Sequence, residues 1–134
     1  MSVSSRRLAY LDSSAIVKLA VSEPESGALR RYLGREPLVS SSLARTEIAR
    51  ALLPLGQEAL ERGDEVLRRL QLLRVSDRVL TAAGRLTPTD VRSLDAIHLA
   101  SARQLGASLR CGVTYDTRMA DAARALGCSV SSPA

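Results

Sequence analysis

The sequence predicts an α/β protein in which helices cover a mainly parallel sheet. Short apolar runs, which are typical of buried strands, alternate along the chain with segments whose apolar residues recur at the helical period. Apolar residues make up 46% of the chain and charged residues 25%, which is the balance of an ordinary globular protein. A length of 134 residues fits one domain, expected over residues 1–134, with a single core.

The chain is expected to enter the fold through a buried strand and a short helix. After an arm at residues 1–7, the run LAYL at residues 8–11 is apolar throughout, as in parallel strands that are covered on both faces. Residues 13–21 follow with a helical pattern. Ser13 or Ser14 is the expected N-cap.

A second helix, a second strand and a third helix come next. Pro24 near the start and Gly34 near the end bound the second helix. The run PLVSS at residues 37–41 predicts a strand. Residues 42–53 form an amphipathic helix, whose expected core-facing residues are Leu43, Ile48, Ala51 and Leu52.

The middle of the chain is expected to be helical with interruptions. Pro54 and Gly56 break the pattern, which resumes over residues 57–73 with Gly63 as a weak point. The run LLRV at residues 72–75 predicts a short strand. A further helix is expected at residues 78–86.

The last third repeats the alternation of helix and strand. A turn at residues 87–90 leads to a helix at residues 93–102. A strand at residues 108–115, a helix at residues 118–127 and a final strand at residues 128–132 complete the expected order.

The charge balance permits a nucleic-acid partner without requiring one. The net charge is +5, and Lys18 is the only lysine, so nearly all the positive charge is arginine. Such a surface attracts phosphates, but a genome rich in arginine codons gives the same composition, and the two explanations weigh equally. The three aromatic residues are all tyrosines, which leaves few platforms for stacking bases.

The sequence shows no targeting or membrane segment, because Asp12 and Lys18 interrupt the apolar run near its start. We therefore expect a cytoplasmic protein. Cys111 and Cys128 lack the spacing of a metal site. Both are expected to be reduced and structural, with a disulfide as the lesser alternative.

Four acidic residues lie at the ends of predicted strands or near the starts of predicted helices. Asp12 and Asp116 each follow a predicted strand, Asp95 lies in the first turn of an apolar helix, and Glu47 lies early in the third helix. Since the carboxyl ends of parallel strands and the starts of the following helices share one edge, these residues predict one acidic cleft. Each alone has a structural explanation as a helix cap, a partner of the helix dipole or a solvated charge.

Clustered carboxylates have a chemical requirement. Their mutual repulsion raises their pKa values unless a cation lies among them. Carboxylate oxygens are hard ligands, and without cysteine or paired histidine ligands they favour Mg²⁺ or Mn²⁺. One or two such ions activate water for attack on a phosphodiester. The cluster therefore predicts metal-dependent hydrolysis.

The same residues carry a family resemblance. The stretches YLDSSAIVKL, SLDAIHLASA and VTYDTRMADAARALG, with the helix that carries Glu47, occur in one order over nearly the whole chain. Together they resemble the PIN-domain nucleases, specifically the VapC toxins of bacterial toxin–antitoxin pairs. The resemblance implies a three-layer α/β/α sandwich and an Mg²⁺- or Mn²⁺-dependent endoribonuclease. It also implies a homodimer that a cognate VapB antitoxin inhibits, and it places the catalytic, metal-binding acids on Asp12, Glu47, Asp95 and Asp116.

The resemblance also assigns supporting positions. Ser14 and Thr114 are the hydroxyls that position the acids or their water, while Asp121 is either a further acid of the site or a solvated charge. Residues 54–63 correspond to the variable hairpin that makes dimer or antitoxin contacts. The leucines in and beside it either serve those contacts or belong to the core: Leu53, Leu55 and Leu60.

His98 is the only histidine and lies three residues after Asp95. A lone histidine in an apolar helix is more often a packed residue with satisfied hydrogen bonds than a catalyst, so His98 is left out of the predicted catalytic set. Two other functions are compatible with an α/β fold of this kind. The four acids speak against a PIN fold that binds RNA or a partner without turnover. Ser14 speaks against a phosphatase with an aspartyl nucleophile, which needs a second acid at that position.

Overall fold

The computed structural model describes residues 7–134 and contains one sheet in which all five strands pair in parallel, in the order β3-β2-β1-β4-β5. The strands are β1 (Leu8–Leu11), β2 (Leu38–Ser41), β3 (Gln71–Leu73), β4 (Leu109–Val113) and β5 (Val130–Ser131). The predicted parallel sheet is confirmed. Most of the expected N-terminal arm, residues 1–6, lies outside the described residues.

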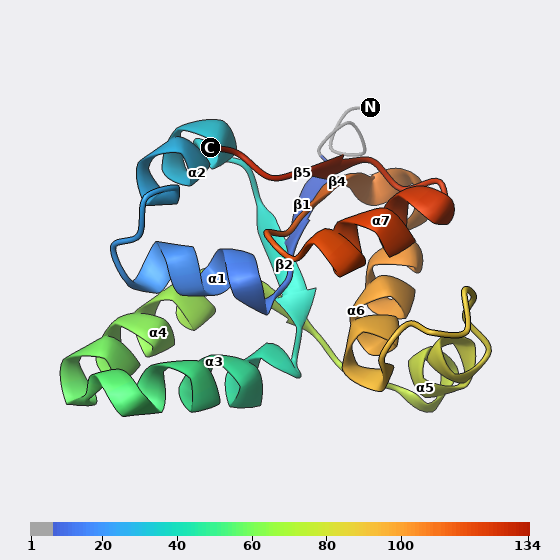
Figure 1. Ribbon diagram of the computed structural model, residues 1–134, viewed down its shortest axis with the longest axis horizontal. Helices are drawn as coiled ribbons and strands as arrows, with labels where there is room; N and C mark the ends of the chain where they lie inside the picture. Colours follow the sequence, from blue (N-terminus) through green and yellow to red (C-terminus); the bar gives the residue numbers. More distant parts are fainter. Residues whose placement is uncertain (1–6) are drawn as a thin grey trace.

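Helices cover both faces of this sheet, which confirms the three-layer α/β/α sandwich. In Figure 1, α1, α2, α3 and α4 lie on one side of the strands and α5, α6 and α7 on the other. The helices are α1 (Ser13–Ala20), α2 (Ser26–Leu33), α3 (Ala44–Leu52), α4 (Gln57–Arg69), α5 (Asp77–Gly84), α6 (Ser93–Arg103) and α7 (Thr117–Ala125). Two 3₁₀ turns, η2 (Leu53–Leu55) and η3 (Gly106–Ser108), precede α4 and β4.

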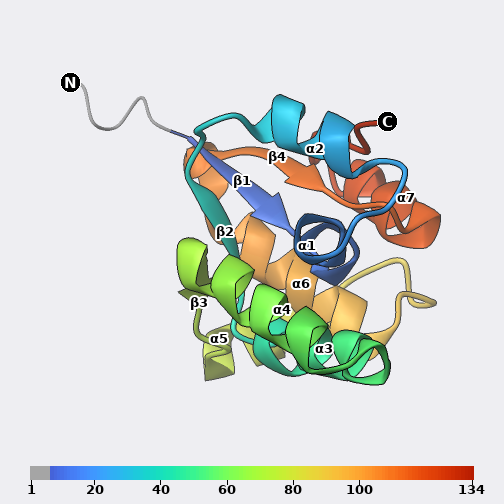
Figure 2. The same ribbon diagram turned by 90° about the vertical axis from the view of Figure 1, so that its left-hand side faces the viewer.

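The central strand β1 explains why its sequence reads as apolar without alternation. Ala9 and Leu11 are fully buried in the core between the sheet and α1–α4. Tyr10 points to the opposite face and packs with Val39 and Ala102. Because successive side chains of a strand alternate between faces, both faces are covered only if every residue is apolar. Figure 2 shows β1 running between these two layers towards the start of α1.

Two details of the helices differ from the prediction. The N-cap of α1 is Asp12, whose side chain accepts the Ala15 backbone N–H, so neither Ser13 nor Ser14 caps the helix. Ala51, expected in the core, is exposed. The buried residues of α3 are Ala44, Ile48 and Leu52, which recur every four positions along one face, and Ala51 lies off this face.

Gly63 is not a weak point, because α4 continues through it from Gln57 to Arg69. A Cβ atom at this position would lie 2.6 Å from Leu52 Cδ1 and 3.1 Å from Ile48 Cγ2. The glycine is therefore the point of close approach between α4 and α3.

The leucines of this hairpin divide between core and surface. Leu60 packs partly buried against the core, whereas Leu53 and Leu55 are 53% and 61% exposed. Both cysteines are free thiols, Cys111 buried and Cys128 partly buried. Within residues 7–134, every helix is too short or too polar to cross a membrane.

Candidate active site

The predicted acids sit at the carboxyl edge of the sheet, beside its topological switch point. The chain builds β1, β2 and β3 in one direction and then places β4 on the other side of β1. Asp12 directly follows β1, and Asp116 lies shortly after β4 at the N-cap of α7. Ligands of open α/β sheets bind in the crevice at such a point, so the edge between β1 and β4 is the place to look for chemistry.

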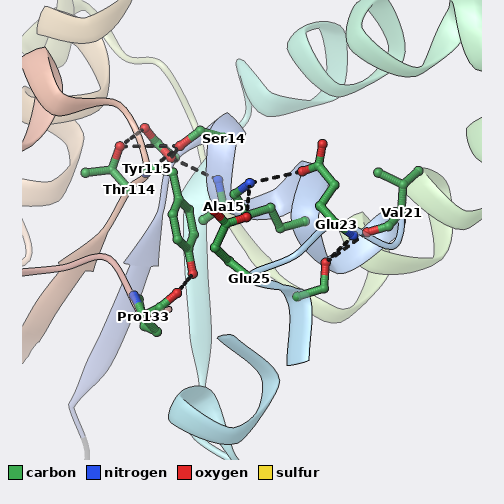
Figure 3. A network of polar contacts seen from close by, with 11 residues as sticks. Ser14, Ala15, Val21, Glu23, Glu25, Thr114, Tyr115 and Pro133 are labelled. Carbon is green, nitrogen blue, oxygen red and sulfur yellow. Dashed lines mark hydrogen bonds and ion pairs between the residues drawn. The ribbon is translucent and has the colours of Figure 1, made fainter. Parts of the chain in front are cut away.

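Asp12 is the buried centre of this edge, with 7% of its surface exposed. Its Oδ1 accepts the Ser14 hydroxyl at 2.7 Å and the Ala15 N–H at 3.2 Å, and its Oδ2 accepts the Thr114 hydroxyl at 2.5 Å. Figure 3 shows Ser14, Ala15 and Thr114 converging from two segments of the chain. Burial raises the pKa of Asp12 above its usual range, although the hydrogen bonds to Ser14, Thr114 and Ala15 act to lower it.

Ser14 and Thr114 tie the two strand ends together. The Ser14 hydroxyl donates to Asp12 and accepts the Tyr115 N–H at 2.8 Å, and its oxygen is 3.4 Å from Thr114 Oγ1. Thr114 donates to Asp12 and accepts the Asp116 N–H at 3.0 Å. Both hydroxyls therefore fix the position of Asp12 relative to the backbone that precedes α7.

Glu47 lies in the first turn of α3 and is held through one oxygen. Its Oε1 accepts the Ser13 hydroxyl at 2.5 Å and lies 2.6 Å from His98 Nε2. The Nδ1 atom of His98 lies 2.8 Å from the hydroxyl of Tyr10. Burial acts to raise the pKa of Glu47, but the hydrogen bonds from His98 and Ser13 and the nearby imidazole hold it below its usual value.

His98 is buried, with 3% of its surface exposed, and both ring nitrogens have partners. The expectation of a packed, satisfied histidine is therefore confirmed. The sequence placed His98 within reach of the acids, but it gave no signal that Tyr10 would complete the contact. Tyr10 belongs to β1, and its hydroxyl reaches the ring across 88 positions of the chain.

Asp95 and Asp116 lie in more open surroundings. Asp116 is exposed and caps α7, since its Oδ1 accepts the N–H groups of Arg118 at 2.9 Å and Met119 at 3.3 Å. Asp95 is partly exposed, and its pKa is raised by burial and then by the negative charges of Asp116 and Asp12. Asp95 therefore lies close enough to Asp116 and Asp12 to be repelled by both.

A hollow of about 400 Å³ opens beside Asp95. Two arginines, Arg92 and Arg118, share its wall with the acids. The full lining is Pro88, Asp90, Val91, Arg92, Asp95, Arg118, Met119, Asp121 and Ala122. The Asp121 side chain is 83% exposed and lies 3.8 Å from Arg124, which is the arrangement of a weak surface ion pair.

The single lysine of the chain is engaged elsewhere at this edge. Lys18 Nζ lies 3.1 Å from Glu23 and 2.9 Å from Glu25, and 4.8 Å from the centre of the Tyr115 ring. Figure 3 shows Glu23, Glu25 and Tyr115 around this contact. The positive charge that faces the hollow therefore comes from arginine.

The donors at this edge suit a hard divalent cation, although they do not form a closed site. Among residues 7–134, no three Asp, Glu, His or Cys side chains lie close enough to hold an ion in their present positions. Asp12 is nevertheless a buried carboxylate, and no lysine or arginine of residues 7–134 lies within ion-pair distance of it. A buried charge of this kind requires compensation, and oxygen donors select Mg²⁺ or Mn²⁺.

Comparison with known proteins places the chain among nucleases. The PIN domain family matches residues 9–125. Ribonuclease VapC46 of Mycobacterium tuberculosis is 60% identical over 125 residues, which cover 92% of this chain and 96% of that protein. Ribonucleases VapC47 and VapC35 of the same species are 38% and 40% identical, each over 92% of this chain and 96% of the relative.

Solved structures share the fold at low sequence identity. The Mycobacterium tuberculosis VapC20 structure, titled a Sarcin-Ricin loop cleaving toxin, superimposes with a TM-score of 0.70 at 17% identity, over 85% of this chain and 94% of that one. VapBC2 from Rickettsia felis, bound to a DNA fragment from its promoter, superimposes with a TM-score of 0.66 at 14% identity, over 92% of this chain and 97% of that one.

Proposed function

Because this chain belongs to the PIN-domain family and is a VapC-type toxin ribonuclease, we propose that it cleaves RNA with Mg²⁺ or Mn²⁺ held at the carboxyl edge of its sheet. The observation that carries this proposal is the buried Asp12 carboxylate, which has hydroxyl donors but no basic partner in the described part of the chain. The acids that would hold the ion are Asp12, Glu47, Asp95 and Asp116. Such an ion would polarise a phosphoryl oxygen and lower the pKa of a bound water.

The residues of the chain then have distinct tasks. Ser14 and Thr114 orient Asp12, because their hydroxyl protons point at its two oxygens. Arg92 and Arg118 face the hollow beside Asp95, and we assign them to the phosphates of the RNA, which guanidinium groups bind well. Asp121 lines the same hollow, and because its side chain is largely exposed we give it no part in holding the ion.

The partners follow from the family. The proposal includes homodimerisation, action in the cytoplasm and inhibition by a VapB-type antitoxin. The exposed Leu53 and Leu55 beside α4 are the apolar residues on which such contacts would rest. One structural relative was solved as a VapBC complex, which supports an antitoxin partner for this chain.

The proposal is tested with D95N. The Asp95 side chain is partly exposed and makes no hydrogen bond within residues 7–134, so its substitution leaves the fold intact. We expect wild-type protein to cut RNA with Mg²⁺ or Mn²⁺, to stop when the metal is chelated and to resume when it is restored. We expect D95N to show no cleavage under any of these conditions.

The matched control is D64N, which changes an exposed acid of α4 away from this edge and should cut RNA as the wild type does. Equal cleavage by wild type and D95N with metal present contradicts the site. RNA binding without any metal-dependent cleavage by the wild type favours the alternative, a binding module without turnover.

A further inference from the structure

Three side chains that are far apart in the sequence form one continuous hydrogen-bonded network behind the candidate site. The Tyr10 hydroxyl lies 2.8 Å from His98 Nδ1, and His98 Nε2 lies 2.6 Å from Glu47 Oε1. Tyr10 comes from β1, His98 from α6 and Glu47 from α3. This hydrogen-bonded network therefore crosses from one helical layer to the other at the end of the sheet.

The direction of the contact between His98 and Glu47 follows from the chemistry of the groups. The Glu47 carboxylate can only accept, so His98 Nε2 carries the proton of their contact. Nδ1 of an uncharged ring then accepts from the Tyr10 hydroxyl, whereas a protonated ring donates from Nδ1 to the Tyr10 oxygen. Ser13 donates to the same oxygen of Glu47 at 2.5 Å. Oε1 thus has two donors, and Oε2 has none within residues 7–134.

Both members behind Glu47 are fixed by burial. Tyr10 and His98 are each 3% exposed, and their rings meet edge to face with centroids 5.9 Å apart. Glu47 itself is only partly buried. The Glu47 carboxylate is therefore held by one buried side chain, His98, which Tyr10 in turn holds from the core.

We propose that His98, backed by Tyr10, is a positioning residue that fixes Glu47 through Oε1 so that its Oε2 stays free to bind a divalent ion. This inference rests on the proposed function. Partners that orient metal-binding carboxylates from behind are common in metal sites, and their removal typically weakens metal binding or activity by about 10- to 100-fold.

The test compares two substitutions of the same histidine. In H98Q the side-chain amide reaches the position of ring Nε2 and still donates to Glu47. In H98N the amide matches ring Nδ1, which retains the Tyr10 contact and loses Glu47. We expect H98N to weaken Mn²⁺ binding by about 10- to 100-fold in calorimetric titration without RNA, and H98Q to weaken it less than H98N.

Y10F provides a second variant that removes one oxygen atom and leaves the ring in place. It should weaken Mn²⁺ binding while lowering kcat rather than raising KM for RNA. Its matched control is Y32F, since the Tyr32 hydroxyl lies 2.9 Å from Ser131 Oγ and does not contact Glu47. Y32F should bind Mn²⁺ as the wild type does.

Equal Mn²⁺ affinities for H98Q and H98N overturn the positioning role, as does a Y10F variant that binds Mn²⁺ no worse than Y32F. D95N separates this failure from that of the proposed function. If D95N loses Mn²⁺ and H98N does not, only the positioning role fails. If D95N also binds Mn²⁺ as the wild type does, the proposed metal site itself is wrong.

Discussion

The two halves of the candidate site are held in different ways. Asp12 and Glu47, the clamped acids, accept hydroxyl and imidazole protons from residues that are themselves fixed in the fold. Asp95 and Asp116, the open acids, lie nearer solvent. Asp116 is held only by backbone N–H groups of its own helix, and Asp95 by no hydrogen bond within residues 7–134.

Because of this difference, one pair of acids has fixed positions and the other pair can move. We expect the clamped acids to keep one geometry when a ligand binds, because moving them breaks several hydrogen bonds at once. Asp95 and Asp116 repel each other, and Asp95 can turn towards a cation without breaking a hydrogen bond within residues 7–134. Asp116 keeps Oδ2 available for a cation while its Oδ1 caps α7. A site built in this way has one preformed side, while the other side completes it on binding.

The largest expected effect comes from D12N, which neutralises the most buried of the clamped acids. Cleavage should fall by more than the ~100-fold that indirect partners of a metal cost. The metal-free variant should nevertheless be at least as stable as the wild type, because it no longer carries a charge at a position whose burial raises the pKa of Asp12. RNA cleavage and urea unfolding without metal measure the two effects.

The dependence of this stability difference on pH checks its cause. Burial raises the pKa of Asp12 in the folded state, so the folded wild type takes up its proton at a higher pH than the unfolded chain. The loss of folding stability caused by the buried Asp12 charge is complete when the pH is above the pKa of Asp12 in the folded protein. It disappears as the pH falls to the pKa of Asp12 in the unfolded chain, about 4. The advantage of D12N should therefore be greatest near neutral pH and shrink on acidification. The opposite trend would mean that the hydrogen bonds to Asp12 outweigh its burial.

A smaller effect is expected from T114V, which removes one clamp and leaves the acid. Asp12 Oδ2 would lose its donor in a buried place, at a cost of about 1–3 kcal/mol in the free energy of unfolding. Mn²⁺ affinity should fall by about tenfold. T117V is the control, because Thr117 is exposed at the start of α7. If both variants behave alike, the hydroxyl clamp does not hold Asp12.

The smallest effect is expected on the open side, from R118A. Arg118 lines the hollow beside Asp95, so its loss should weaken RNA binding modestly and reduce the slope of log affinity against log salt by about one. Fluorescence anisotropy with the metal chelated measures this slope. R124A, on the same helix but outside the hollow, should leave it unchanged. Equal slopes for both variants would remove Arg118 from the RNA path.

The sequence predicted the parts of this arrangement that follow from topology. Apolar runs located the strands, and the rule that strand ends share an edge placed Asp12 and Asp116 together. It offered Asp12 as a possible helix cap beside Ser13 and Ser14 without selecting it, because three residues with capping side chains stand in a row at positions 12–14 and only the backbone geometry selects one of them.

The sequence does not predict which side chains of distant segments form hydrogen bonds with one another. The link from Glu47 to His98 spans 51 positions and that from His98 to Tyr10 spans 88, and no local pattern encodes either distance. Gly63 was misread for the same reason. Helix propensity judges a glycine by its own helix, whereas its role here is set by Leu52 on the neighbouring one.

That glycine also bears on the chemistry at a distance. Because Gly63 has no side chain, α4 packs closely against Ile48 and Leu52 of α3. The glycine therefore helps to set the position of α3, the helix that carries Glu47. A larger residue must displace the Leu52 and Ile48 side chains, and we expect the resulting shift of α3 to draw the carboxylate away from Ser13 and His98. Genetic selections for survivors of the toxin would then recover lesions in this hairpin as well as at the acids, although α4 contributes no polar atom to the reaction.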